Sequence, residues 1–158
     1  MPKPEYYIPT DEDMDMVGDI SYELEQMRLA QTAGAELGWD DPRSWLLAEA
    51  GLIHARALME FLFYPSLQPR ERQTALSRAT WYTTRAWRPS ERRLEFESRI
   101  GMSVTDVKAS IDLRICHLSV NRHDVATPNL GRVLEALEYM WELMRAHLRP
   151  EWKERFPA

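Results

Sequence analysis

Residues 42–62 read PRSWLLAEAGLIHARALMEFL and predict the helix around which the fold is built. Asp41 precedes it as an N-cap, and Pro42 occupies the first helical position, where the missing backbone N–H costs no hydrogen bond. Pro65 ends the segment, because proline cannot continue a helix. The apolar residues fall on more than one side of this helix, so we expect it at the centre of a bundle. They are Trp45, Leu46, Leu52, Ala55, Leu58, Met59 and Leu62.

The preceding segment, residues 11–33, also has helical periodicity. Its apolar residues recur at alternating steps of three and four, which places them on one stripe. Gly34 is the expected end of this helix, because glycine is typical of helix C-termini. The stripe consists of Val17, Ile20, Leu24 and Met27.

Residues 64–89 are interrupted by prolines, and we interpret them as a loop with helical turns. Ser90 is the expected N-cap of a following helix over residues 91–100, and Gly101 is its expected end.

A longer helix is predicted next. Ser103 or Thr105 starts it, and apolar residues with heptad-like spacing carry it to Leu118, after which residues 121–124 end it.

The last long helix follows Thr127 and Pro128 and stops before Pro150. Its apolar stripe is the most regular in the chain. The stripe consists of Leu130, Leu134, Leu137, Trp141, Met144 and Leu148.

No segment has the pattern of a β-strand, and no repeat or linker divides the chain. Amphipathic helices joined by short connections must bury their stripes against one another. The sequence therefore predicts an all-α fold, an antiparallel bundle of four to five helices, in a single domain over residues 1–158.

The composition bounds the classes of function. Cys116 is the only cysteine, and the first residues are polar, so we expect a protein of the cytoplasm without disulfides. Every apolar run is too short to span a bilayer, which predicts no membrane association. The net charge is −5, but residues 70–99 carry eight arginines against four glutamates, a local +4 that leaves −9 for the rest. A partner could recognise this asymmetry.

His54 and Arg56 are the first candidates for a polar site. Two residues turn a helix by about 200°, so the two side chains cannot face one point. Arg56 and Glu60, one turn apart, can form an ion pair. His54 is interpreted either as a hydrogen-bonded packing residue or as part of a site.

His117 is the second candidate, on a polar face that it shares with Arg114. If its ring and that of His54 entered one pocket, they could act as general acid and base near neutral pH. The same face is equally typical of the solvated side of a bundle helix.

Other site chemistries are disfavoured. The Glu-x-x-His pairs of bundle di-metal sites are absent, and Cys116 lies in an apolar context that makes it inert, so we predict no metal. Glycine motifs for nucleotides are absent too, and we predict no cofactor.

Aromatic residues alternate with arginines in the basic segment, which allows two interpretations. The rings could stack nucleic-acid bases while the guanidiniums bind phosphates. Alternatively, the rings could close the end of the bundle while the arginines pair with acidic groups or dock an acidic protein. The residues are Arg78, Trp81, Tyr82, Arg85, Trp87 and Arg88.

Residues 54–62, HARALMEFL, together with residues 115–118, ICHL, and Arg122, resemble a group of uncharacterised bacterial helical-bundle proteins. In that group a His-Ala-Arg-x-Leu-x-x-Phe-Leu segment precedes an Arg-Ile-Asn-Lys-x-Ile-x-His-Leu segment. The second motif in turn resembles the Arg-x(4 to 6)-His signature of HEPN domains. That resemblance implies an all-α bundle that often dimerises and, in many toxin and defence proteins, cleaves RNA at a site made by both subunits.

The chain departs from this motif at its arginine. Ser110 stands seven positions before His117, where the motif has arginine, and Asp112 stands at the polar position two residues further on. Metal-independent cleavage needs a cation on the phosphate while the histidine moves protons. Arg114, one turn before His117, is the nearest substitute.

Three hypotheses follow. The first is a non-catalytic HEPN-like homodimer that binds RNA, a nucleotide or a protein in a bacterial or phage defence or regulatory setting. The second is a ribonuclease that uses His117 with Arg114 or Arg122, and with His54 as a further participant. The third is an interaction module whose acidic and basic faces dock other proteins.

Overall fold

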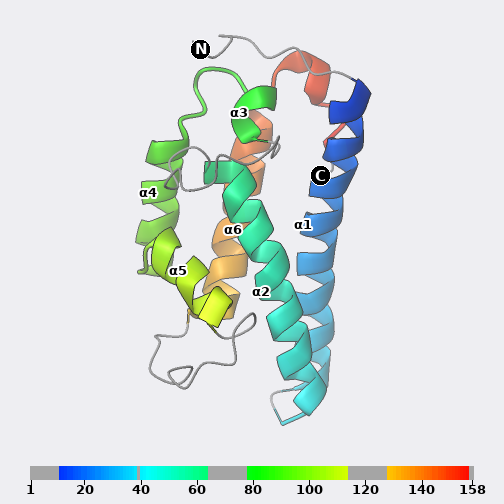
Figure 1. Cartoon of the computed structure of the whole chain (residues 1–158), viewed down its shortest axis with the longest axis vertical. Helices are drawn as coiled ribbons and strands as arrows, with labels where there is room; N and C mark the ends of the chain where they lie inside the picture. The colour runs from blue at the N-terminus through cyan, green and yellow to red at the C-terminus, as the bar shows by residue number, and fades with distance from the viewer. Residues whose placement is uncertain (1–10, 39, 64–77, 114–127, 157–158) are drawn as a thin grey trace.

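The structure is a computed structural model that describes residues 11–38, 40–63, 78–113 and 128–156, with residues 11–16 described by their backbone only. These residues contain no β-strand, so the predicted all-α class is confirmed. Figure 1 shows the helices gathered into one bundle. They are α1 (Asp11–Leu37), α2 (Pro42–Phe63), α3 (Ala79–Tyr82), α4 (Pro89–Ile100), α5 (Val104–Ile111) and α6 (Leu130–Ala146), followed by a 3-10 helix (Pro150–Trp152).

The hairpin of α1 and α2 is the longest feature of the bundle (Figure 1). The prediction that α1 ends at Gly34 was wrong, because the helix continues to Leu37 and the left-handed turn is made by Gly38, with φ of 76°. Gly34 lies inside the helix, where a Cβ would be 3.8 Å from the Cβ of Leu47. A Cβ at this distance would make ordinary van der Waals contact, so neither a turn nor the packing requires glycine at this position.

The start of α2 is as predicted. Pro42 is its first residue, and the backbone N–H of Arg43 donates a hydrogen bond of 2.9 Å to Asp41 Oδ1. The backbone N–H of Ser44 donates to the carbonyl of Asp41 at 2.9 Å. Asp41 thus satisfies donors that the first helical turn leaves without a partner.

The start of α4 differs from the prediction. Pro89 is already helical and Arg88 is the N-cap residue, so Ser90 lies inside the helix and does not cap it. Proline at the first helical position supplies the required φ without a capping side chain. Gly101 ends α4 in the left-handed conformation, as predicted.

Serine and asparagine side chains cap the next two helices. Ser103, one of the two predicted starts, accepts a hydrogen bond of 3.0 Å from the backbone N–H of Asp106 and so caps α5. Asn129 caps α6 by accepting from Arg132 at 3.0 Å. The predicted continuation of the α5 helix to Leu118 lies outside the described residues.

α2 contacts α1, α3, α4, α5 and α6, which confirms its predicted position at the centre of the bundle. α6 packs against α1, α2 and α4. Its predicted stripe is buried from Leu134 to Met144, while Leu148 lies beyond the helix end in a single β-bridge with Thr83. Burial of one such large apolar side chain contributes about 1.5–3 kcal/mol, so this stripe is a major source of stability.

Candidate functional site

His54 binds to α1. Its Nδ1 lies 2.7 Å from Glu23 Oε2, and its ring is nearly perpendicular to that of Tyr22, with the two centroids 5.9 Å apart. The His54 side chain is 20% exposed. The ring therefore has a partner in each of two α1 side chains, and it links the two helices of the hairpin.

Arg56 lies on the opposite side of α2 and binds to α5, as the separation of two residues predicted. Its Nη1 lies 2.5 Å from Asp112 Oδ1, and its Nε lies 3.5 Å from Glu60 Oε1, which confirms the predicted intrahelical pair. Lys108 Nζ is 2.5 Å from the same oxygen of Glu60. Two cations and two carboxylates thus form a neutral network that joins α2 to α5.

Ser110, at the position of the motif arginine, is fully buried. An arginine there would have to bury its charge in the core at a large desolvation cost. Among the residues that the structure describes, Arg56 of α2 brings a guanidinium to the end of α5 through its contact with Asp112. Sequence spacing did not reveal this contact, because the two residues lie 56 positions apart.

The other candidates of this motif, Arg114, His117 and Arg122, lie outside the described residues, as does Cys116. Their relation to His54 therefore stays a prediction.

The basic segment meets the C-terminal segment at one end of the bundle. The side chain of Arg149 donates to the carbonyl of Trp81, and its backbone N–H donates to the carbonyl of Tyr82 at 2.9 Å. The backbone N–H of Thr84 donates to the carbonyl of His147 at 2.8 Å. These bonds hold two segments that are more than sixty residues apart in the sequence side by side.

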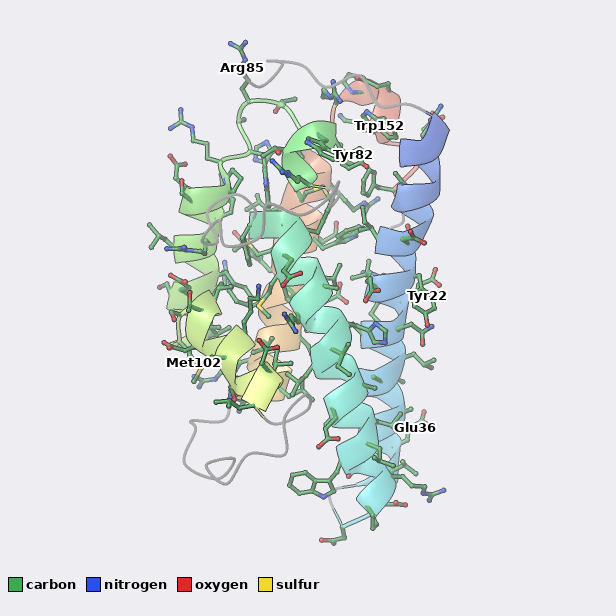
Figure 2. All side chains as sticks on the ribbon, viewed as in Figure 1. Tyr22, Glu36, Tyr82, Arg85, Met102 and Trp152 are labelled. Carbon is green, nitrogen blue, oxygen red and sulfur yellow. The ribbon has the colours of Figure 1, made fainter. Side chains whose placement is uncertain are left out.

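Cations from both segments gather at this place, which we call the arginine-rich end. Figure 2 shows Arg85, Tyr82 and Trp152 at the same end of the molecule. The Cζ atom of Arg78 lies 5.7 Å from the centre of the Trp81 ring, and that of Arg155 lies 5.3 Å from the centre of the Trp152 ring. The arginine-rich end consists of Arg78, Arg85, Arg88, Arg149, Lys153 and Arg155.

The aromatic residues of the basic segment belong mainly to the core. Tyr82 is fully buried and Trp87 is 3% exposed, while Trp81 is half-buried. Rings from the C-terminal segment cover Tyr82, with centroids of Trp152 at 4.9 Å and Phe156 at 5.2 Å. Tyr82 and Trp87 therefore close the end of the bundle, and neither ring is open to stacking by a base.

A polar cluster that the sequence did not suggest joins α4 to α6. Glu95 accepts hydrogen bonds from Arg92 at 2.8 Å and from the Tyr139 hydroxyl at 2.9 Å. Burial raises the pKa of Glu95, but these two bonds outweigh that effect and the pKa lies below its usual value. Arg99 covers the Tyr139 ring at 3.5 Å. The cluster fastens two helices and leaves no group poised for proton transfer.

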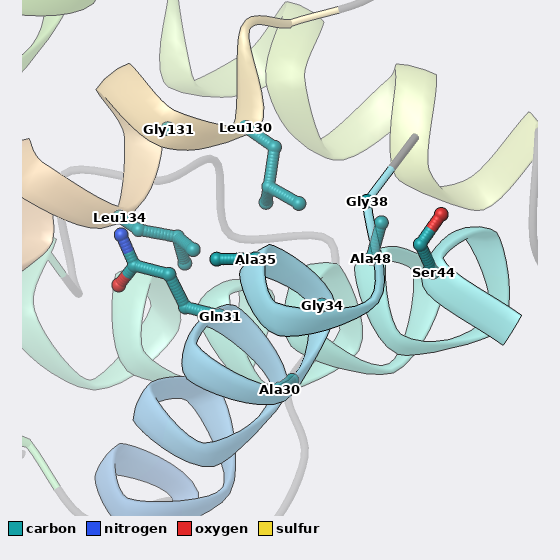
Figure 3. Close-up of a pocket in the computed structure, with 10 residues that line it drawn as sticks. All are labelled: Ala30, Gln31, Gly34, Ala35, Gly38, Ser44, Ala48, Leu130, Gly131 and Leu134. Carbon is teal, nitrogen blue, oxygen red and sulfur yellow. The ribbon is translucent and has the colours of Figure 1, made fainter. Parts of the chain in front are cut away.

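A cleft of about 280 Å³ lies where α1, α2 and the start of α6 meet. Figure 3 shows Leu130 and Leu134 of α6 facing Gln31 and Ala35 of α1. Ser44 is the one buried polar residue in its lining, and its hydroxyl donates to the carbonyl of Asp41 at 2.7 Å. The cleft is apolar and offers no group for catalysis. Its lining is Ala30, Gln31, Gly34, Ala35, Gly38, Ser44, Ala48, Leu130, Gly131 and Leu134.

Two further searches of the described residues had negative results. No three histidine, cysteine or carboxylate side chains there are grouped so that they could hold a metal ion. No helix in the same ranges has the length and hydrophobicity that crossing a membrane requires.

Comparison with protein-family models, curated proteins and solved structures found no match to this chain. The geometry of the described residues is therefore the basis of the functional argument.

Proposed function

We propose that this chain is a non-catalytic, HEPN-like antiparallel bundle that binds RNA through its arginine-rich end. The observation that carries the proposal is the convergence of the cations of residues 78–88 with those of residues 149–155. Phosphate contacts with arginine and lysine supply most of the affinity in non-specific nucleic-acid binding. The bacterial or phage defence or regulatory setting and the cytoplasmic location belong to the same proposal.

The burial of the aromatic rings determines the kind of binding. Tyr82 and Trp87 cannot stack on bases, so phosphate contacts dominate and the binding tolerates many sequences. Arg85 and Arg88 are exposed, and Arg88 is held only by a surface ion pair of 2.9 Å with Glu91. Such a pair is weak, so a phosphate can replace the carboxylate.

The buried Ser110 supports the absence of catalysis. The motif requires a cation beside the scissile phosphate, and a residue without solvent access cannot contact one. Arg56, whose guanidinium contacts Asp112 at the end of α5, is neutralised by Asp112 and Glu60.

Fluorescence anisotropy with a labelled single-stranded RNA tests the proposal. We expect binding that weakens between about 50 and 200 mM salt. The double variant Arg85→Glu/Arg88→Glu should lose at least about tenfold in affinity, or about 1.4 kcal/mol. The matched control Arg132→Glu reverses one exposed arginine at the opposite end, in the first turn of α6, and should bind as the native chain does.

Equal binding by the double variant and the control would overturn the arginine-rich end as the site. Incubation of the same RNA with the native chain tests the absence of catalysis. Cleavage that disappears in His117→Ala would replace this proposal with the ribonuclease hypothesis.

A further inference from the structure

One side of the α1–α2 hairpin has no covering element among the described helices. The other side packs against α6, where Arg28 of α1 donates to both carboxylate oxygens of Glu138 at 2.6 and 2.7 Å. Of the seven large hydrophobic side chains that are exposed in the described ranges, five lie on this hairpin. Figure 2 shows one of them, Tyr22, projecting outward from α1.

Four of these side chains form two parallel lines on the side away from α6. Tyr22 and Leu29 are seven residues apart on α1, which is two helical turns, so they share a face. Leu46 and Ile53 have the same relation on α2. Their exposed fractions are 53% and 59% on α1 and 67% and 46% on α2.

Small side chains lie between these two lines. Helical periodicity places Ala33 of α1 and Ala50 and Ala57 of α2 at the border of the two helices, and all three are half-buried. Large residues two turns apart with small residues between them form ridges that another helix can fit against. The contact of the Tyr22 ring with His54 holds one ridge against α2. We call this surface the outer face.

The charges beside the outer face are acidic. Asp19, Glu25 and Glu36 of α1 are exposed, and Glu25 adds to the negative potential at Arg28. The arginines of the hairpin are each bound to a carboxylate, Arg28 to Glu138, Arg43 to Asp41 and Arg56 to Asp112. Scattered exposed apolar residues are ordinary, whereas exposed apolar side chains aligned on two neighbouring helices beside carboxylates indicate an interaction surface.

We infer that the outer face binds a basic amphipathic helix of a partner protein. The apolar side of such a helix would cover the exposed side chains of both ridges, while its lysines and arginines would pair with the rim. A second copy of this chain fits poorly, because two outer faces would bring their carboxylates together. RNA is repelled for the same reason, so this surface is separate from the arginine-rich end.

Two synthetic peptides test this inference against the full chain. Both have about five helical turns and the same leucine face, and their polar positions are lysine in one and glutamate in the other. Titration calorimetry should detect binding of the lysine peptide, weakening as salt rises, and no binding of the glutamate peptide.

Substitutions on the face locate the binding. Leu46→Lys and Ile53→Lys should each weaken the lysine peptide by at least about tenfold, because a cation then opposes the cationic peptide and an apolar contact is lost. The control is Leu94→Lys on α4, where the native side chain is 61% exposed, a fraction close to that of Leu46. It should leave peptide affinity unchanged, and circular dichroism melts should show all three variants folded.

Three results would overturn the inference. The first is equal affinity for the two peptides, or no binding of either peptide. The second is an equal loss in Leu94→Lys, which would indicate non-specific attraction. The third is self-association in sedimentation experiments that Ile53→Lys abolishes, which would assign the outer face to a second copy of the chain.

Discussion

At the arginine-rich end Tyr82 and Trp87 are buried and Arg85 and Arg88 are exposed, whereas on the outer face Tyr22 and Leu46 are exposed beside carboxylates. The first surface therefore offers charge and few rings, and the second offers apolar contact with charge only at its rim. Charge alone favours a polyanion with little base preference, whereas apolar contact with a charged rim favours a shaped protein partner. Four tests would sharpen or break this contrast.

The largest expected effect is a loss of stability on removal of a buried ring at the arginine-rich end. Tyr82→Ala should lower the free energy of unfolding by about 3–5 kcal/mol, because it removes the ring that Trp152 and Phe156 pack against. Trp45→Ala should change it by less than about 0.5 kcal/mol, since the native ring is 61% exposed. Urea unfolding measures both. Similar losses in the two variants would mean that the two regions bury their rings alike.

Substitution of two glycines compares the contact between α1 and α2 with the solvent-exposed side of the hairpin. Gly51→Val should destabilise by about 2 kcal/mol, because even a Cβ at this position lies 3.3 Å from the Cβ of Ala30. Gly18→Ala should stabilise by up to about 1 kcal/mol, because nothing lies within 4 Å of the added carbon and alanine favours the helix. Thermal melts measure both shifts. A stable Gly51→Val protein would show that the helices can move apart at little cost.

Loss of a carboxylate should affect stability differently at α6, where Glu138 binds Arg28, and on the outer face, where Glu36 is exposed. Glu138→Gln should cost about 0.5–1 kcal/mol, because it weakens the bidentate pair with Arg28, whose partly exposed position limits the effect. The same pair raises the pKa of Arg28. Glu36→Gln on the outer face should be neutral within error in urea unfolding. A loss as large in Glu36→Gln would mean that the rim is already neutralised.

The smallest effect is a titration at the turn of the hairpin. Hydrogen bonds from the side chain and backbone of Arg43 lower the pKa of Asp41 to about 2. Since the folded pKa lies below the ordinary value of 3.8, the contribution of this carboxylate to stability is present above about pH 4 and is lost as the pH falls toward 2. NMR titration should show this midpoint, and Arg43→Gln should raise it. An unchanged midpoint in that variant would assign the shift to another cause.

Capping residues in the sequence correctly predicted several helix ends. Asp41 and Pro42 located the start of α2, and Gly101 located the end of α4. Gly34 and Ser90 misled, because a glycine can also lie inside a helix and a serine inside the first helical turn. In the first case Gly38, four residues later, makes the turn, and in the second the preceding Pro89 already begins the helix.

For the candidate site, the sequence predicted only the relative directions of side chains on the same helix. The separation of His54 and Arg56 correctly placed them on opposite sides of α2, but their partners on α1 and α5 were not foreseen. The cations of Arg149 and Arg155 were likewise missing from the predicted basic segment. These relations arise only when segments distant in sequence are brought together.

From the sequence alone follow the helical class, most helix ends and the direction in which each side chain leaves its helix. These are local properties, since backbone hydrogen bonding and apolar periodicity act over a few residues. The tertiary structure decided which rings are buried, which charges are neutralised and which apolar side chains stay exposed. Those outcomes depend on which helices meet, and short-range periodicity carries no information about that choice.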